Sequence, residues 1–182
     1  QRGPGRRRRR GGRARRLMGR RGPHRRPVGL VRVVAVRRGT GAAALVLSRA
    51  STATAKGQTP VARIVASAAH AQEPSAFTTA PVGAINKCLA KAGWSIADVD
   101  LFEVNEAFAC VAMFAMRDLG IPHEKINVHG GATALGHPIG ASGARIITTL
   151  IGALKHKGLK RGVASLCIGG GEGTAIAIEL VD

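Results

Sequence analysis

The chain has 182 residues, with 28 basic and 10 acidic side chains and a net charge of +18 at neutral pH. This length is enough for one domain with a sizeable core. The three cysteines, Cys88, Cys110 and Cys167, are too few and too far apart for a disulfide framework or a zinc site, and they fit a reducing compartment.

The positive charge is concentrated at the N-terminal end. Residues 1–38 contain 16 arginines and no acidic residue, whereas residues 39–182 contain 12 basic and 10 acidic side chains. With no helical period and few apolar residues before Val28, residues 1–38 are predicted to be a leader that is disordered on its own. Three interpretations stay open: an arm that binds phosphate backbones, a mitochondrial transit peptide, or an aberrant, wrong-frame translation of a GC-rich gene.

Two further patterns bear on location and partners. No apolar run is long enough to span a bilayer, and no signal-peptide pattern is present. The arginine-rich arm has no aromatic side chains on which bases could stack. We therefore expect a soluble, cytoplasmic protein that binds no membrane, and the missing aromatic side chains argue against specific binding of single-stranded nucleic acid.

After Gly39 the chain alternates between strand-like and helix-like patterns. The predicted elements, in chain order, are a short helix over 48–57, a strand over 61–69, a helix from Pro81 to Gly93, a strand over 101–104, a helix over 106–119, a strand over 126–128, a helix with an apolar face over 147–154, and strands over 163–168 and 174–181. This order predicts an α/β layered domain. Ligands of such domains gather beyond the carboxyl ends of the strands, where Asn105, His137 and Cys167 are expected.

The stretch from Asn127 to Arg145 is rich in glycine and contains two histidines. His137 stands between Gly136 and Pro138, which fix a loop and leave the ring accessible, so it is a candidate general base. A single loop histidine is more often structural, and that interpretation stays open. For His129 we favour a surface or packing role.

Asn105 follows the predicted strand 101–104 and has two interpretations. Its amide can orient a water molecule or donate to a developing oxyanion. It can also simply cap the helix that is predicted to begin at Glu106. Taken by itself, the residue is interpreted as a cap, and the oxyanion role stays open.

Cys167 ends a predicted strand and precedes the run Gly169–Gly171. Beside an imidazole its thiol could act as a thiolate, while a buried cysteine is usually a small apolar residue. Cys88 and Cys110 fall within predicted helices and are interpreted as packing residues. Neither glycine run is followed by the lysine and hydroxyl of a phosphate-binding loop.

Three stretches together resemble the thiolase family: Asn105-Glu106-Ala107-Phe108, residues 127–145 with their Gly-His-Pro-Ile-Gly-Ala-Ser-Gly centre, and residues 165–173. Their order and spacing also match, and the resemblance runs from about Gly41 to the C-terminus. The sequences of residues 70–74 and 77–81 are similar to those of the acetyl-CoA acetyltransferases, the biosynthetic branch of the family.

The resemblance implies the C-terminal half of the thiolase fold, a layered αβα domain, and acyl transfer between coenzyme A thioesters through a cysteine-bound acyl group. By this resemblance His137 activates the nucleophilic cysteine and helps to bind the thioester oxygen, and Asn105 holds a water molecule there. Cys167 shuttles the proton at the substrate α-carbon, and the Gly169 amide lines a second oxyanion site. An acyl-CoA substrate and a homo-oligomer are expected, with no metal and no cofactor besides the coenzyme A thioester.

The chain also departs from the family. None of its cysteines matches the family's nucleophile, which lies far upstream. We therefore expect a leader over 1–38, a remnant of the thiolase N-terminal domain over 39–60, and the thiolase C-terminal domain over 61–182. The chain alone is predicted to be an incomplete, inactive acyltransferase. The alternative is a non-catalytic thiolase-like domain whose basic arm binds nucleic acid.

Overall fold

Four strands form the central sheet of the computed structural model, which describes residues 32–37 and 40–181. They are β3 (Ala62–Ala71), β4 (Leu101–Val104), β5 (Arg161–Ile168) and β6 (Glu172–Leu180), in the order β3–β6–β5–β4. A tight turn joins β5 to β6, so these two pair antiparallel, as do β6 and β3. Strands β4 and β5 pair in parallel, because the chain between them crosses over through helices.

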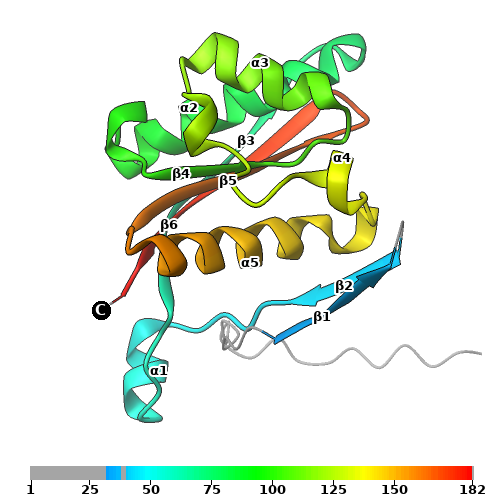
Figure 1. The fold of residues 1–182 in the computed structure, drawn as a ribbon. Helices are drawn as coiled ribbons and strands as arrows, with labels where there is room; N and C mark the ends of the chain where they lie inside the picture. Colours follow the sequence, from blue (N-terminus) through cyan, green and yellow to red (C-terminus); the bar gives the residue numbers. More distant parts are fainter. Residues whose placement is uncertain (1–31, 38–39, 182) are drawn as a thin grey trace, which may run out of the picture.

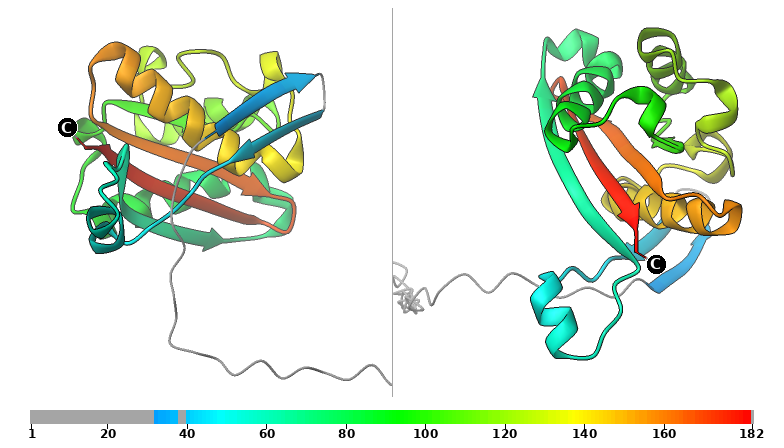
Figure 2. Two further views of the ribbon diagram at one scale, coloured as in Figure 1. Left: turned by 90° about the horizontal axis from the view of Figure 1, so that it is seen from below. Right: turned by 90° about the vertical axis from the view of Figure 1, so that its left-hand side faces the viewer.

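Helices cover both faces of this sheet. Helices α2 (Ala80–Ala92) and α3 (Ala109–Leu119) lie on one face, and α5 (Ile139–Lys157) lies on the other (Figures 1 and 2). All four residues of β4 are buried, as expected for a strand between two helical layers. The predicted layered αβα class is confirmed.

The alternation of side chains along β4 divides the core in two. Phe102 and Val104 pack with α2 and α3, whereas Leu101 packs with Leu150 and Leu154 of α5. Successive residues of a strand point to opposite faces, so Glu103 and Asn105 follow Leu101 toward α5. This placement decides what the polar end of β4 contacts.

Glycines end the three long helices. Gly93, Gly120 and Gly158 follow α2, α3 and α5 with φ angles of 68°, 65° and 66°. In this left-handed conformation a side chain would be strained, and the residue closes the last helical turn.

The described N-terminal part forms a β-hairpin and a short helix. Strand β1 (Arg32–Arg37) pairs antiparallel with β2 (Thr40–Ala44), β2 packs along α5 (Figure 2), and α1 (Ala50–Ala55) follows. Residues 32–37, which lie within the predicted leader over 1–38, form β1. The sequence RVVAVR is rich in β-branched valine, which favours a strand once a partner strand is present. Residues 1–31 and 38 lie outside the described part of the chain.

Short helical turns connect the main elements. They are η1 (Pro74–Thr79), η2 (Ile96–Asp98), η3 (His123–Lys125) and α4 (Ala132–Leu135). The predicted strand over 126–128 does not form. Ile126 makes one bridge to Phe102, and Asn127 has a φ of 47°. The Asn127 side chain bonds both the N–H and the C=O of Val104, so an amide replaces the backbone of a neighbouring strand.

The glycine-rich stretch is also more helical than a loop. Helix α4 occupies Ala132–Leu135, and α5 begins at Ile139, directly after Pro138. Only Gly136, His137 and Pro138 connect the two helices. His137 is thus held on a short connection between two helices.

Candidate active site

The carboxyl end of β4 and the start of α5 bring two of the predicted site residues together. The Asn105 backbone N–H donates to the carbonyl oxygen of Ser165 in β5 at 2.9 Å, which fixes its place on the sheet. Its side chain is buried, and its Nδ2 lies 3.5 Å from Nδ1 of His137. The structure therefore places Asn105 beside His137.

The alternative role of Asn105 as a helix cap is wrong. Helix α3 begins at Ala109, three positions after the predicted start at Glu106, and its N-cap residue is Phe108. The Asn105 side chain instead points toward α5, where its Oδ1 accepts a hydrogen bond from Nη2 of Arg145 at 3.2 Å.

His137 is half-buried and is contacted by the first turns of α5. Its Nδ1 lies 2.6 Å from the hydroxyl oxygen of Ser142, a buried residue. The same hydroxyl lies 3.1 Å from the carbonyl oxygen of Pro138. The ring is thus oriented on its Nδ1 side by both Asn105 and Ser142.

A buried ion pair lies behind Asn105. Nη1 of Arg145 donates to Oε1 of Glu103 at 2.9 Å, and the two side chains are 10% and 2% exposed. Burial raises the pKa of Glu103 to about 7, although the Arg145 guanidinium acts in the opposite direction. No role for this pair was predicted from the sequence. The sequence did contain a signal for this pair, because Glu103 lies inside a strand that is otherwise apolar, and a buried carboxylate requires a cation or hydrogen-bond donors beside it.

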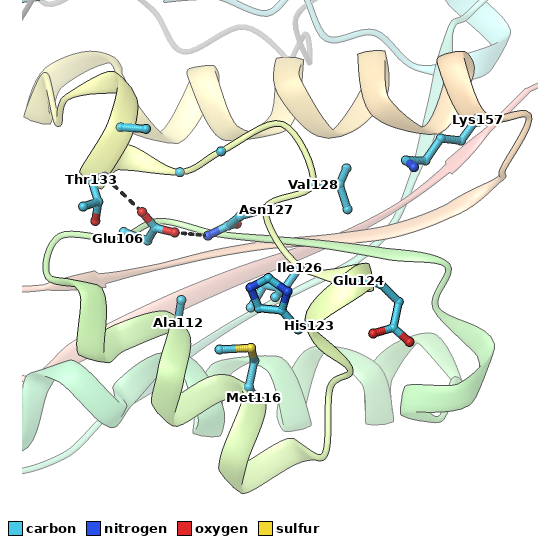
Figure 3. Close-up of a pocket in the computed structure, with 13 residues that line it drawn as sticks. Glu106, Ala112, Met116, His123, Glu124, Ile126, Asn127, Val128, Thr133 and Lys157 are labelled. Carbon is cyan, nitrogen blue, oxygen red and sulfur yellow. Dashed lines mark hydrogen bonds between the residues drawn. The ribbon is translucent and has the colours of Figure 1, made fainter.

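A second carboxylate holds the glycine-rich stretch against the sheet. The Glu106 carboxylate accepts hydrogen bonds from Nδ2 of Asn127 at 2.9 Å and from the backbone N–H of Thr133 at 3.0 Å (Figure 3). Burial raises the pKa of Glu106, but these hydrogen bonds outweigh it and hold the pKa below its usual range. A Cβ on Gly131 would lie 2.2 Å from the Glu106 carboxyl carbon, so this close approach requires glycine.

A pocket of about 610 Å³ adjoins Glu106 on the side of α3 and η3 (Figure 3). It is lined in part by Met116, His123, Glu124 and Lys157. Neither Asn105, His137 nor Cys167 lines it, so this pocket is separate from the polar cluster at the end of β4.

Cys167 and Gly169 lie at the carboxyl end of β5 but are not joined to the Asn105–His137 pair. Cys167 is 8% exposed and packs in the core shared with α2 and α3, on the opposite face from the Asn105 side chain. Burial raises the pKa of its thiol. Gly169 begins the turn to β6, and the space where its Cβ would be is open. The proposed roles of these two residues remain predictions.

The remaining cysteines and His129 lie away from the polar cluster at the end of β4. Cys88 is fully buried in the α2 core, and Cys110 is half-buried in α3. His129 is exposed, with its ring centroid 5.9 Å from that of His156. Across the described ranges there is no cluster of three or more histidine, cysteine or acidic side chains that could hold a metal ion. None of the described helices is both long and apolar enough to cross a membrane.

Comparison with known proteins identifies the family. The family description "Thiolase, C-terminal domain" matches residues 58–180. The chain belongs to the thiolase family. This chain is 50% identical to an acetyl-CoA acetyltransferase of Allochromatium vinosum over 139 residues, which are 76% of its length. It is 51% identical over the same length to a cytosolic acetyl-CoA acetyltransferase of Mus musculus.

Solved structures agree with the assigned fold. A Bacillus anthracis acetyl-CoA acetyltransferase superposes with a TM-score of 0.76 and 46% identity over 78% of this chain and 36% of its own. Human mitochondrial 3-ketoacyl-CoA thiolase gives a TM-score of 0.74 and 43% identity over 78% of this chain and 37% of its own. The present chain spans about a third of the length of its curated relatives, 35% for both acetyltransferases above.

Proposed function

We propose that this chain carries part of the active site of a thiolase-type acyltransferase, an acetyl-CoA C-acetyltransferase. The observation that supports this most directly is the contact of Asn105 with His137, with 3.5 Å between Nδ2 and Nδ1. The pair lies inside the segment that is 50% identical to an acetyl-CoA acetyltransferase.

The proposed reaction joins two acetyl-CoA molecules into acetoacetyl-CoA and releases one coenzyme A. In the reverse direction, coenzyme A cleaves a 3-ketoacyl-CoA. His137 takes the proton of the nucleophilic thiol and then hydrogen-bonds the thioester oxygen together with a water molecule on Asn105. Cys167 transfers the proton at the substrate α-carbon, and the Gly169 amide stabilises the negative charge on the second thioester oxygen. Burial raises the pKa of this thiol, so its thiolate is a stronger base, which suits removal of the proton from the α-carbon.

The nucleophile is the missing part of this proposal. Cys88 is fully buried in α2, and Cys110 lies within α3, so neither is assigned this role. We propose that the nucleophilic cysteine belongs to a segment outside the 139 matched residues and that this chain alone does not complete turnover.

The proposal extends to substrate, assembly and location. The substrate is an acyl-CoA, and no cofactor is required besides the coenzyme A thioester. A hollow of about 380 Å³ lies between residues 41–43 of β2 and residues 138–141, directly after His137. Homo-oligomerisation and a cytoplasmic location are proposed from the family, and the word "cytosolic" in the name of the mouse relative supports the latter.

A segment exchange tests this function. The 139 matched residues of this chain replace the corresponding segment of the Allochromatium vinosum acetyltransferase, and coenzyme A-dependent cleavage of acetoacetyl-CoA is measured. We expect turnover that falls about 100-fold or more in His137→Ala, the range typical of a lost general base. The matched control is His129→Ala, an exposed histidine of the same stretch. A folded chimera without turnover, or equal turnover in both histidine variants, contradicts the proposed function.

A further inference from the structure

We infer that Gln72 is a positioning residue for the turn Gly169–Gly171. Its side chain, which His70 and Thr79 hold in place, attaches η1 to the end of β3 beside this turn. The catalytic meaning of the inference rests on the proposed function, since the Gly169 amide is the proposed donor to the second thioester oxygen. The contacts that carry it are independent of any reaction.

The turn needs support from outside because it consists of three glycines. Gly169 and Gly170 are exposed, and glycine has the widest range of backbone conformations of any residue. An amide that is to stabilise an oxyanion must be held in place before the reaction. The pairing of β5 with β6 holds the turn on one side only.

The backbone of residues 72–74 supports the other side of the turn. The Gln72 N–H donates to the carbonyl oxygen of Gly171 at 3.0 Å, directly beyond the last residue pair of β3 and β6. A Cβ on Gly171 would collide with the carbonyl oxygen of Gln72 and would lie 3.0 Å from the Pro74 nitrogen. The two backbones are therefore in direct contact, and a shift of residues 72–74 moves the turn.

The Gln72 amide is oriented by two acceptors of η1. The nitrogen and oxygen of an amide are alike in shape, so only their partners decide which is which. The atom 2.6 Å from the Ala76 carbonyl oxygen must be the nitrogen, because a carbonyl oxygen only accepts hydrogen bonds. The second N–H points to Oγ1 of Thr79 at 2.7 Å, and this hydroxyl donates to the same carbonyl oxygen at 2.9 Å. Both amide hydrogens are thus used, and they attach η1 to the end of β3.

His70 holds the oxygen of the same amide. Oε1 of Gln72 lies 3.0 Å from Nε2 of His70, which must then be the ring nitrogen that carries a proton. Nδ1 of His70 is buried and has no hydrogen-bond partner among the described residues, so a proton there would be unsatisfied. A Cβ on Gly83 would lie 2.5 Å from Cδ2 of the ring, so the backbone of α2 packs directly against it. The neutral ring therefore carries its proton on Nε2 and donates a hydrogen bond to Gln72.

The competing explanation is that Gln72 only stabilises η1, while the pairing of β5 with β6 alone places the turn. Gln72→Glu separates the two explanations. A carboxylate can still accept the hydrogen bond from His70, but it has no N–H for Ala76 and Thr79, so η1 loses its attachment. The matched control is Gln58→Glu, which changes an exposed glutamine in the loop after α1.

The test uses the full chain labelled with ¹⁵N and compares the backbone amides of the turn with those of α5. In Gln72→Glu we expect the amide signals of Gly169–Gly171 to move. The protection of the N–H of position 72 against exchange with solvent should fall about 10-fold or more, since two hydrogen bonds are lost nearby. The amides of α5 should change less, and Gln58→Glu should match the wild type.

A second readout needs no variant. At about pH 8.5, above the ordinary histidine pKa of about 6.5, correlations between ring protons and ring nitrogens show which nitrogen of His70 carries the proton. We expect an N–H resonance for Nε2 and a lone-pair resonance for Nδ1. A wild-type ring protonated on Nδ1 overturns the inference.

Thr79→Val keeps the test decisive if Gln72→Glu fails to fold. It removes the hydroxyl that accepts from Gln72 and has nearly the same shape, so the turn signals should move in the same way but less. Turn signals and protection equal to the wild type, in whichever variant folds, overturn the inference. So does a loss of protection that is equally large in α5. Because no turnover is measured, this outcome is separate from that of the segment exchange.

Discussion

Replacing Glu103 by glutamine should remove most of the pH dependence of stability between about pH 4.5 and 7. Glu103 is 2% exposed, and burial raises its pKa from 4.5 to about 7 despite the ion pair with Arg145. Between these two pH values the folded chain binds a proton that the unfolded chain has released. The free energy of unfolding therefore falls as the pH rises through this window.

The size of the effect follows from the shift. Each pKa unit corresponds to about 1.4 kcal/mol, so the shift from 4.5 to about 7 corresponds to about 3.5 kcal/mol once Glu103 is fully ionised. Glutamine resembles the protonated Glu103 and can still accept a hydrogen bond from Arg145. The variant should thus equal the wild type near pH 4.5 and exceed it by up to about 3 kcal/mol at pH 8.

Urea unfolding at several pH values measures this difference. Trp94, the single tryptophan, packs against the core and under the guanidinium of Arg161 at 4.9 Å, so its fluorescence reports unfolding. Other titrating groups contribute equally to both proteins and cancel in the comparison. Parallel stability curves for wild type and Glu103→Gln would refute the assignment of Glu103 as the group with the raised pKa.

Three further predictions concern the residues around the site. Asn127→Ala loses three side-chain hydrogen bonds and should lower the free energy of unfolding by about 3 kcal/mol, measured by urea unfolding; a change below about 0.5 kcal/mol contradicts this. Gly131→Ala must displace Glu106 and should lower the free energy of unfolding by about 1–3 kcal/mol. Gly152→Ala, with nothing near its Cβ inside α5, should raise it by up to about 1 kcal/mol. The reverse order of the two stabilities would refute the role of Gly131. Cys167, whose pKa is raised, should react slowly with a thiol reagent at pH 7 and faster at pH 9, as followed by mass spectrometry. Fast labelling of Cys167 at pH 7 in the folded chain would contradict the raised pKa.

Local patterns were enough to predict most of the sheet and the long helices. The predictions of strand β4 over Leu101–Val104 and of a helix end at Gly93 agree with the structure, because burial and left-handed caps depend on neighbouring residues. The start of α5 was missed. Its first turns contain Gly140 and Gly143, which have low helix propensity and hide the helical period.

The candidate site could be predicted only in part. The residue types of Asn105 and His137 pointed to the end of the sheet, and the fold brings them together. The ion pair of Arg145 with Glu103 joins residues 42 positions apart, and no local pattern showed that α5 would lie over β4. The helix-cap interpretation of Asn105 failed for the same reason, since the tertiary contact with Arg145 replaces the local one.

The proposed division of the active site is tested most directly by acetoacetyl-CoA thiolysis with the purified full chain. We expect no coenzyme A-dependent cleavage above the rate in buffer, because in the proposed function this chain supplies His137 and Asn105 and another segment supplies the nucleophilic cysteine. Cleavage by this chain that disappears in His137→Ala would contradict it, since one of the three cysteines present would then have to act as the nucleophile.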